Sequence, residues 1–374
     1  MTRYSIPGVM HVVDSLDVGG TETVAVNLAN RLPRDRFRSY LCSTRPSPDR
    51  NLLTSSIEHD VRLLGLNRKG TFDLGAILRF HKFLGQEEIQ LLHVHGSSLF
   101  FGRLASILRP FSHVRVVWHD HYGRCELDAR PKGLYRLAIK GAAGVIAVNH
   151  RLADWACREL HVSPQRVWYV PNFVVPSGVK ARIAQSLPGR VGSRIVCVAN
   201  LRPQKDHITL IRAMAQVCQE HPEAHLLLVG LEGDKAYADT LRGEISSLKL
   251  ESNVTFLGQI EGVPSVLSAC DIGVLSSASE GLPLSLLEYG SVGLASIATS
   301  VGQCPEVLDY GRAGILVQQG ASGRLAAAIQ LLLDSPKHRA AYGQRFREHV
   351  KKKFDPAAII GQICDIYDFV LSEN

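Results

Sequence analysis

The chain has 374 residues, more than the roughly 250–300 residues at which one hydrophobic core usually stops growing, so we expect two domains. Apolar residues make up 45% and charged residues 21%, which excludes a disordered or low-complexity chain. The net charge is +7, and residues 1–175 hold 23 Lys and Arg against 15 Asp and Glu, whereas the remainder holds 19 against 20. The N-terminal half is therefore expected to meet an anionic partner such as membrane lipid, nucleic acid or a phosphorylated substrate, with simple solubility as the alternative.

The eight cysteines are scattered singly, without the close pairs that build zinc or redox sites, so we expect reduced thiols. They are Cys42, Cys125, Cys157, Cys197, Cys218, Cys270, Cys304 and Cys364. The start of the chain lacks a charged lead into a long apolar core, and no run approaches the roughly 20 apolar residues that span a bilayer. These features predict a cytoplasmic protein that is neither secreted by a cleaved signal nor integral to a membrane.

Short apolar runs rich in Val, Ile and Leu alternate with helical stretches, which is the pattern of parallel strands covered by helices on both faces. The first series of expected strands covers residues 9–15, 38–43, 61–64, 91–95, 114–118, 145–148 and 167–170. The second series covers residues 194–199, 225–229, 254–257, 272–275, 295–298 and 314–317. Two such series predict an α/β protein with two Rossmann-like, doubly wound domains.

The break between the two series gives the domain boundaries. Residues 1–175 are expected to form the N-terminal domain and residues 194–355 the C-terminal domain. Residues 176–193, which are rich in proline and glycine and show no periodicity, are the expected linker. Residues 356–374 are expected to form a last helix because their isoleucines recur at helical spacing, and this helix is a candidate to pack back on the N-terminal domain.

Doubly wound sheets bind ligands at the carboxyl ends of their strands, and four clusters follow predicted strands there. The first contains Gly19 and Gly20, between the opening strand and a helix. Paired glycines let the backbone approach a ligand, and a helix N-terminus attracts anions. Because the fingerprint Gly-x-Gly-x-x-Gly is missing, a plain tight turn is an equal alternative to a phosphate loop.

The second cluster follows the first strand of the second series and contains Arg202 and Lys205. Both side chains can reach a diphosphate, the arginine with a planar fork and the lysine as a point charge. The alternative is a solvated loop in which Asp206 caps the next helix.

The third cluster is the segment EGLPLSLLE, from Glu280 to Glu288, after the strand expected at residues 272–275. Pro283 is suited to the first position of a helix, which places Glu288 about one and a half turns into an otherwise apolar helix. A carboxylate there is costly without a partner, and ribose hydroxyls would supply one. The alternative is a Glu288 carboxyl bonded to neighbouring backbone.

The fourth cluster is the run Trp118-His119-Asp120-His121, and His93 and His95 end the preceding strand. Imidazole can donate to a reacting hydroxyl or accept its proton. We expect no metal at these histidines, because no carboxylate or thiol completes either pair at ligand spacing.

Taken together, these clusters resemble the family 4 retaining glycosyltransferases over nearly the whole chain and in the right order. The most specific element is EGLPLSLLE, which is similar to that family's paired-glutamate motif. The resemblance implies the GT-B fold, in which two Rossmann-like doubly wound domains face a central cleft that holds the donor's diphosphate. It also implies transfer of a sugar, with retention of configuration, from a nucleoside-diphosphate sugar.

The resemblance further implies roles for individual residues. Glu280 would contact the donor sugar near the reacting centre, and Glu288 would bind the ribose of the nucleotide. His119 would act on the acceptor side and count with Glu280 as catalytic. The remaining implied contacts are Gly19, Gly20, Arg202 and Lys205 with the diphosphate, and Gly281, Leu282 and Leu284 with the sugar or ribose.

One departure from the family pattern concerns the second cluster. Many members carry Gly-Arg-Leu before the lysine, whereas Ala199-Asn200-Leu201 precedes it here. Asn200 thus stands in the usual place of the arginine, and whether Arg202 reaches the same phosphate oxygens is open. No Asp-x-Asp metal motif occurs, so stabilisation of the leaving diphosphate is expected from Arg202, Lys205 and helix N-termini, with neither a metal nor another cofactor.

The acceptor is expected to be a saccharide or lipid-linked saccharide in cell-surface polysaccharide or glycolipid synthesis. Lys132, Arg136 and Lys140 recur every four residues and suggest peripheral contact with the inner face of an anionic membrane. Two other readings stay open, namely a nucleotide-sugar epimerase or phosphorylase-like enzyme on the same architecture and a non-catalytic nucleotide-sugar-binding scaffold. No nucleic-acid-binding motif is evident. The nucleobase, the donor sugar, the linkage and the oligomeric state are not legible from the sequence.

Overall fold

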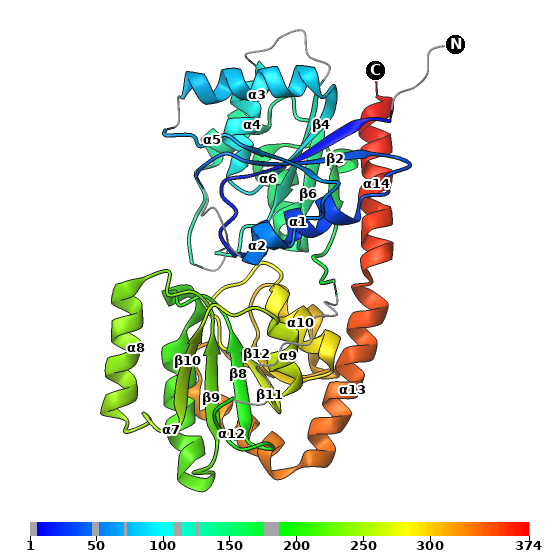
Figure 1. The fold of residues 1–374 in the computed structure, drawn as a ribbon. Coiled ribbons are helices and arrows are strands. Elements are labelled where there is room, and N and C mark those ends of the chain that lie inside the picture. Colours follow the sequence, from blue (N-terminus) through cyan, green and yellow to red (C-terminus); the bar gives the residue numbers. More distant parts are fainter. Residues whose placement is uncertain are drawn as a thin grey trace. The chain divides into compact units, whose positions relative to one another are not determined.

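The computed structural model describes residues 6–46, 52–70, 73–107, 114–124, 127–175 and 187–373. The chain divides into two compact units (Figure 1). The first unit consists of Met1–Tyr122, Ala129–Phe173 and Pro356–Asn374, and the second of Gly123–Asp128 and Val174–Asp355. Of the linker expected at residues 176–193, residues 176–186 lie outside the described part of the chain.

A seven-stranded parallel sheet with the order β3-β2-β1-β4-β5-β6-β7 forms the centre of the first unit. Its strands are β1 (Gly8–Val13), β2 (Arg38–Ser43), β3 (Arg62–Gly65), β4 (Ile89–His95), β5 (Arg115–Asp120), β6 (Gly144–Ala147) and β7 (Val167–Tyr169). The strand order reverses between β1 and β4, so ligand chemistry is expected at the carboxyl ends of these two strands.

Helices cover both faces of this sheet, as alternating strands and helices require. They are α1 (Gly20–Arg31), α2 (Leu52–Ser55), α3 (Leu74–Gln86), α4 (Ser98–Ile107), α5 (Lys132–Ile139), α6 (His150–Leu160), the 3-10 helix η1 (Pro164–Arg166) and α14 (Pro356–Ser372). On one face Met10, Val12 and Val94 pack against α3 and α4. On the other face α1 packs at Val13 and Leu41, and α14 places Tyr367 against Phe37.

A six-stranded parallel sheet with the order β10-β9-β8-β11-β12-β13 forms the centre of the second unit. Its strands are β8 (Arg194–Val198), β9 (His225–Val229), β10 (Val254–Gly258), β11 (Ile272–Leu275), β12 (Ala295–Thr299) and β13 (Ile315–Val317). The order reverses between β8 and β11, which makes the loops after these strands the expected binding edge.

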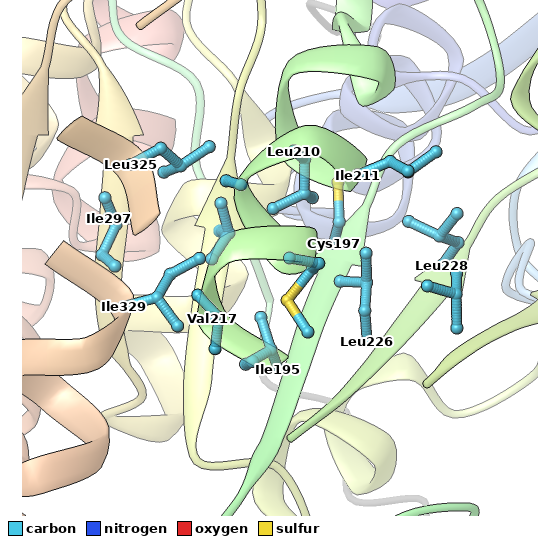
Figure 2. Close-up of a cluster of buried hydrophobic side chains, with 14 of the residues drawn as sticks. Ile195, Cys197, Leu210, Ile211, Val217, Leu226, Leu228, Ile297, Leu325 and Ile329 are labelled. Carbon is cyan, nitrogen blue, oxygen red and sulfur yellow. The ribbon is translucent and has the colours of Figure 1, made fainter. Parts of the chain in front are cut away.

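The helices of the second unit again flank the sheet. They are η3 (Pro203–Lys205), α7 (His207–Glu220), α8 (Lys235–Ser247), α9 (Val263–Ser268), α10 (Leu284–Val292), α11 (Cys304–Val307), η4 (Asp309–Gly311), α12 (Ser322–Asp334) and α13 (Pro336–Lys353). Figure 2 shows the core on one face, where Ile195 and Leu226 of the sheet meet Leu210 of α7 and Ile329 of α12. Such near-continuous apolar strands are typical of a parallel sheet buried on both faces.

Every strand predicted from the sequence is present, and no strand end is displaced by more than two residues. The difference between predicted and observed strands that matters most for the candidate site is in β5, which extends to Asp120 rather than ending at residue 118. His119 and Asp120 are therefore strand residues that point to opposite faces of the sheet, not members of one loop.

Candidate functional site

In the second unit, the loops that follow β8 and β11 are joined by hydrogen bonds. Ser276 Oγ donates to the carbonyl oxygens of Lys205 (3.1 Å) and Asp206 (3.0 Å), and the Ala278 amide donates to the carbonyl oxygen of Gln204 (2.8 Å). Gln204 Nε2 returns a bond to the Ser279 carbonyl at 2.9 Å. Because these bonds fix the two loops against each other, Lys205 and the segment that begins at Glu280 are held as one rigid group.

Lys205 and Glu280 form an ion pair at the centre of this group. Lys205 Nζ lies 2.6 Å from Glu280 Oε1, and Ser277 Oγ donates to the same oxygen at 2.6 Å. The Glu280 residue is only 5% exposed, so the pair is largely shielded from water and salt. We call Lys205, Ser277 and Glu280 the lysine–glutamate site. Lys205 retains two further ammonium donors for a ligand, and Glu280 retains its second oxygen as an acceptor.

The backbone of Glu280 is fixed from below by the loop after β12. Gly302 has a φ of +50°, and a Cβ at this position would lie 2.1 Å from the Glu280 carbonyl oxygen. The Gln303 amide also donates to the Gly281 carbonyl at 3.0 Å. Only glycine can adopt the positive φ at position 302 and approach the Glu280 carbonyl this closely without strain. The contact therefore fixes the position of the Glu280 loop relative to the sheet.

Helix α10 begins at Leu284 with Pro283 as its N-cap, one residue later than predicted. Leu282 and Leu284 are buried, so their side chains serve packing rather than contact with a sugar or ribose. Glu288 lies on α10 among apolar neighbours. Part of its side chain remains accessible, yet burial raises the pKa of its carboxyl to about 7. Among the described residues no hydrogen bond to this carboxyl is recorded, which argues against the backbone-bonded alternative and leaves a costly group that a ligand can satisfy.

The residues before Lys205 divide into a structural and an exposed position. Asn200 Oδ1 accepts a hydrogen bond from the Leu231 amide at 3.0 Å, which ties the loop after β8 to the loop after β9. Arg202 is exposed and runs beside Gly233, where a Cβ would lie 3.4 Å from the arginine Nε. The arginine is thus free to turn toward an anion. Asp206 caps α7 by accepting from the Thr209 amide at 3.3 Å, as the alternative for this cluster predicted.

In the first unit, five histidines gather on one face of the sheet at its reversal point. They are His11 on β1, His93 and His95 on β4, and His119 and His121 at and just after the end of β5, and we call them the histidine cluster. His11 is paired in register with His93, and His95 with His119. Alternate residues of a strand share a face, so this register places the five rings side by side.

Two lines of hydrogen bonds run through the histidine cluster. In one, Tyr367 of α14 is bonded to His93 Nδ1, and His93 Nε2 lies 3.0 Å from His119 Nδ1. In the other, His11 Nδ1 lies 3.1 Å from His95 Nε2, and His95 Nδ1 lies 3.1 Å from His121 Nε2. The outer nitrogens, Nε2 of His11 and Nε2 of His119, are buried and have no partner among the described residues.

The histidine cluster is electrically neutral at ordinary pH. Burial lowers the pKa of His11 and of His121 to about 3, and burial together with neighbouring histidines holds the pKa of His93, His95 and His119 well below 6.5. Each ring therefore carries one hydrogen, on either Nδ1 or Nε2, and can donate one hydrogen bond and accept one.

The other predicted anion site of the first unit, at Gly19 and Gly20, lies at the start of helix α1. Gly19 is the N-cap of α1 with an extended φ of −152°, and a Cβ there would lie 2.4 Å from Glu22 Oε2. The Glu22 carboxylate in the first turn thus already complements the helix dipole. Glycine is not needed here for a left-handed conformation.

The basic stripe of α5 is partly neutralised within the unit. Lys132 Nζ lies 2.6 Å from Glu159 Oε2, and Arg136 Nε donates to the Glu159 carbonyl at 2.6 Å. Leu134 and Leu137 of the same helix are 60% and 71% exposed. Within the described ranges, no helix has the length and apolar character needed to cross a bilayer. The seven described cysteines are free thiols, and Cys125 lies outside the described residues.

Sequence reasoning missed three members of these sites. Ser277 gave no signal in an ordinary loop. His11 sits on β1, and its parity with His93 could have revealed it once the reversal between β1 and β4 was assumed. Tyr367 sits in a helix whose apolar spacing suggested only packing.

Known protein families match both halves of the chain. The family described as Glycosyltransferase Family 4 matches residues 18–177, and the family described as Glycosyl transferases group 1 matches residues 186–349, so the two together span most of the chain. A curated relative is the N-acetyl-alpha-D-glucosaminyl L-malate synthase of Bacillus anthracis, 27% identical over 371 residues, covering 96% of each chain. Another is the UDP-Gal:alpha-D-GlcNAc-diphosphoundecaprenol alpha-1,3-galactosyltransferase of Escherichia coli, 25% identical over 301 residues, covering 76% of this chain and 77% of that protein.

Solved structures show the same fold. Anabaena HepE in complex with UDP and glucose superposes with a TM-score of 0.81 at 21% identity, covering 97% of this chain and all of the other. Sucrose-phosphate synthase from Thermosynechococcus elongatus gives the same TM-score and identity over 98% of this chain. The two Rossmann-like domains are those of the GT-B fold. The two matched segments show that the chain belongs to the family 4 glycosyltransferases.

Proposed function

We propose that this glycosyltransferase moves a sugar, with retention of configuration, from a nucleoside-diphosphate sugar to a hydroxyl of a saccharide or lipid-linked saccharide. The observation that carries the proposal is the lysine–glutamate site, a shielded ion pair at the point where strand order reverses. A group that binds both the negative diphosphate and the hydroxyls of a sugar needs a cation and an acceptor side by side, and Lys205 and Glu280 supply both.

The donor is proposed to bind in the second unit. Lys205 and the exposed Arg202 would neutralise the diphosphate as its bond to the sugar breaks, which is the main electrostatic demand of the reaction. Glu280 would accept from sugar hydroxyls, and Glu288 would accept from the ribose. Because the sequence contains no Asp-x-Asp motif, these side chains would take the role that a metal plays in other glycosyltransferase folds.

UDP is the nucleotide we would test first. Anabaena HepE was solved with UDP and with UDP-glucose, and the name of the Escherichia coli relative specifies UDP-Gal. A mannosyltransferase of Corynebacterium glutamicum, 33% identical over 169 residues, is named as dependent on GDP-mannose. These relatives thus support a nucleoside-diphosphate sugar as a class and favour uridine over guanosine.

The acceptor is proposed to meet the first unit at His119, at the carboxyl end of β5. Relatives named for diphosphoundecaprenol and phosphatidylinositol acceptors support a lipid-linked saccharide. The exposed Leu134 and Leu137 on α5, beside Lys140, would then touch an anionic membrane at its inner face. Flotation with neutral and with anionic vesicles tests this contact, and a protein that stays unbound to both removes it.

The test of the donor site is titration calorimetry with UDP, GDP, ADP and CMP, in EDTA and in added magnesium. We expect one nucleoside diphosphate to bind to the wild type in EDTA, and we expect this binding to be lost in the Glu288→Ala variant. The matched control is Glu220→Ala, an exposed glutamate at the far end of α7, which should bind like the wild type.

Failure of all four nucleotides to bind would contradict the donor assignment. Binding without transfer to any acceptor or hydrolysis of the donor would instead favour the scaffold alternative. Conversion of the donor into a second nucleotide sugar, with no new glycoside, would favour an epimerase.

A further inference from the structure

The line Tyr367–His93–His119 connects the C-terminal helix to the proposed acceptor-side histidine. Tyr367 lies on α14, His93 on β4 and His119 on β5, and all three side chains are buried. Its outer end is Nε2 of His119, which has no partner among the described residues. Tyr367, which has no direct access to substrate, is therefore connected through His93 to His119, whose Nε2 has no protein partner among the described residues.

The hydrogens along the hydrogen bonds Tyr367–His93–His119 can be placed in two ways. If Tyr367 donates to His93 Nδ1, His93 carries its hydrogen on Nε2, and it donates to His119 Nδ1. His119 must then carry its own hydrogen on Nε2. In the reverse arrangement His119 donates from Nδ1, His93 donates to the phenolic oxygen, and Nε2 of His119 is a bare acceptor.

Tyr367 decides between the two arrangements. Tyr367 is fully buried, and within the described part of the chain its hydroxyl bonds only to His93 Nδ1. In the reverse arrangement the phenolic hydrogen would have no acceptor among the described residues, which is a costly state for a buried hydroxyl. Burial also raises the pKa of Tyr367 well above 10, so the hydroxyl keeps its hydrogen.

We propose that Tyr367, acting through His93, fixes His119 in the form that carries its hydrogen on Nε2, so that His119 donates a hydrogen bond to a substrate oxygen. Tyr367 and His93 are positioning residues, and His119 is the group that touches substrate. This inference rests on the proposed function for the substrate contact, but the hydrogen position of His119 is a property of the free protein. A donor at this atom orients an acceptor hydroxyl or a sugar oxygen and does not remove a proton from it.

A metal is the competing occupant of the histidine cluster. Ring nitrogens of His11, His93 and His95, and of His95, His119 and His121, lie within 4.8 Å of one another. A metal binds each imidazole in the plane of its ring, and several planes must converge on it. Here the rings of His93 and His95 are stacked with an interplanar angle of 10°, and those of His95 and His121 with 20°. Coordination would require these rings to turn and both hydrogen-bond lines to break.

The direct test is nitrogen NMR of deuterated protein labelled with ¹⁵N-histidine, in which a ring nitrogen that bears hydrogen is distinguished from one that does not. His119→Gln assigns the signals of His119. We expect hydrogen on Nε2 in the wild type and a mixture of both forms in Tyr367→Phe. The matched control is Tyr40→Phe, a buried tyrosine of the same unit whose hydroxyl bonds Glu87 instead, and it should leave His119 unchanged.

A wild-type spectrum with hydrogen on Nδ1 of His119 overturns the proposal, and this result needs neither substrate nor a stable variant. An unchanged His119 signal in a folded Tyr367→Phe variant also overturns it. Metal that stays bound in protein purified without chelator, and that is coordinated by the hydrogen-free ring nitrogen of His119, favours the metal instead. If His119 carries hydrogen on Nε2 but the protein transfers no sugar, the proposed function fails and the positioning role stands.

Activity separates a donor from a base. Glutamine can present an N–H near the position of Nε2 but cannot take up a proton, so His119→Gln should keep transfer activity within roughly tenfold of the wild type, whereas a lost general base typically costs 10²–10⁴-fold. Tyr367→Phe should lower kcat several-fold with donor KM unchanged, and should have no further effect in the His119→Gln background. A His119→Gln variant as inactive as His119→Ala contradicts the donor role.

Discussion

The two sheets of this protein place opposite chemistry at equivalent positions. At the reversal point of the first sheet, between β1 and β4, lie neutral, buried imidazoles that bond one another. At the reversal point of the second sheet, between β8 and β11, lie a lysine, a glutamate and, on α10, a carboxyl with a pKa near 7. The same fold thus supplies two different sheet edges. The edge of the first sheet offers directional hydrogen bonds and little charge, whereas the edge of the second sheet concentrates charge.

This difference shows that the fold sets where chemistry occurs and the side chains set which chemistry it is. A cluster of neutral imidazoles has little attraction for a diphosphate, whereas Lys205 and Arg202 attract one. The division of labour that we propose, with the donor in the second unit and the acceptor hydroxyl at the first, follows from that contrast.

Acidification should break the first site before the second. Below pH 6.5 the unfolded chain binds a proton at each histidine, while folded His11 binds one only near pH 3. Because the unfolded state binds more protons, stability falls as the pH drops from about 6.5 toward 3, by about 1.4 kcal/mol per pH unit for each histidine kept neutral. The second unit holds fewer such histidines, chiefly His207, whose pKa burial lowers to about 4.

The measurement is urea unfolding between pH 7 and 5. All three tryptophans, Trp118, Trp155 and Trp168, lie in the first unit, so their fluorescence reports on that unit while circular dichroism reports on both. We expect the free energy of unfolding derived from fluorescence to fall by several kcal/mol between pH 7 and 5. The urea midpoint of the fluorescence change should fall more than that of the remaining dichroism change. Equal shifts of the two signals would show that the histidine cluster does not set acid stability.

Removal of the central cation should inactivate the second site. Lys205→Ala is expected to lower kcat about 10²–10³-fold, because a positioned donor to developing negative charge is typically worth that much. Lys235→Ala, at the exposed start of α8, is the matched control and should be neutral. The double variant Lys205→Ala/Glu280→Gln separates the causes, since recovery of activity there would mean that the unpaired glutamate, not the lost cation, was responsible.

Substitution of Gly302 should disturb the second site from its backbone. Gly302→Ala places a non-glycine residue at φ +50° and a Cβ 2.1 Å from the Glu280 carbonyl, so we expect a loss of about 3 kcal/mol in stability and reduced donor affinity. Gly320→Ala has φ +70° and no atom within 4 Å of its Cβ, and should cost only about 1–2 kcal/mol. Thermal unfolding compares the two, and equal losses would show that the contact with Glu280 adds nothing.

The smallest effect should be the pH dependence of nucleotide affinity. The Glu288 carboxyl has a pKa of about 7 and must be ionised to accept from both ribose hydroxyls, so binding should be constant above pH 7 and weaken below it, up to about tenfold per pH unit. Calorimetric titration between pH 6 and 8 measures this slope, and Glu288→Gln should abolish it. Affinity that instead weakens above pH 7 would mean that the protonated carboxyl donates to the ligand.

Most of the fold was legible from the sequence because parallel strands buried on both faces are continuous apolar runs. The paired glutamates, Lys205 and His119 could be singled out as candidates, because each lies at or beyond the carboxyl end of such a run. Their partners were not found. Ser277 and Gly302 act on Glu280 through contacts between loops, and the register that joins His11 to His93 depends on a crossover between strands far apart in the chain.

Asn200 shows a different limit of sequence reasoning. Its position suggested a missing phosphate contact, while its amide oxygen in fact holds the backbone of Leu231. Polar residues that bond backbone leave no spacing pattern, so a structural role and a ligand-binding role look alike until the backbone partner is known.

The last helix of the chain has a consequence for synthesis. Helix α14 belongs to the first unit and supplies Tyr367 to His93, although more than 180 residues of the second unit precede it. On the ribosome, Phe37 and the histidine cluster therefore stay uncovered while the whole second unit is made and folds. The first unit closes only when residues 356–372 emerge, so the half of the protein that is translated first is the half that is finished last.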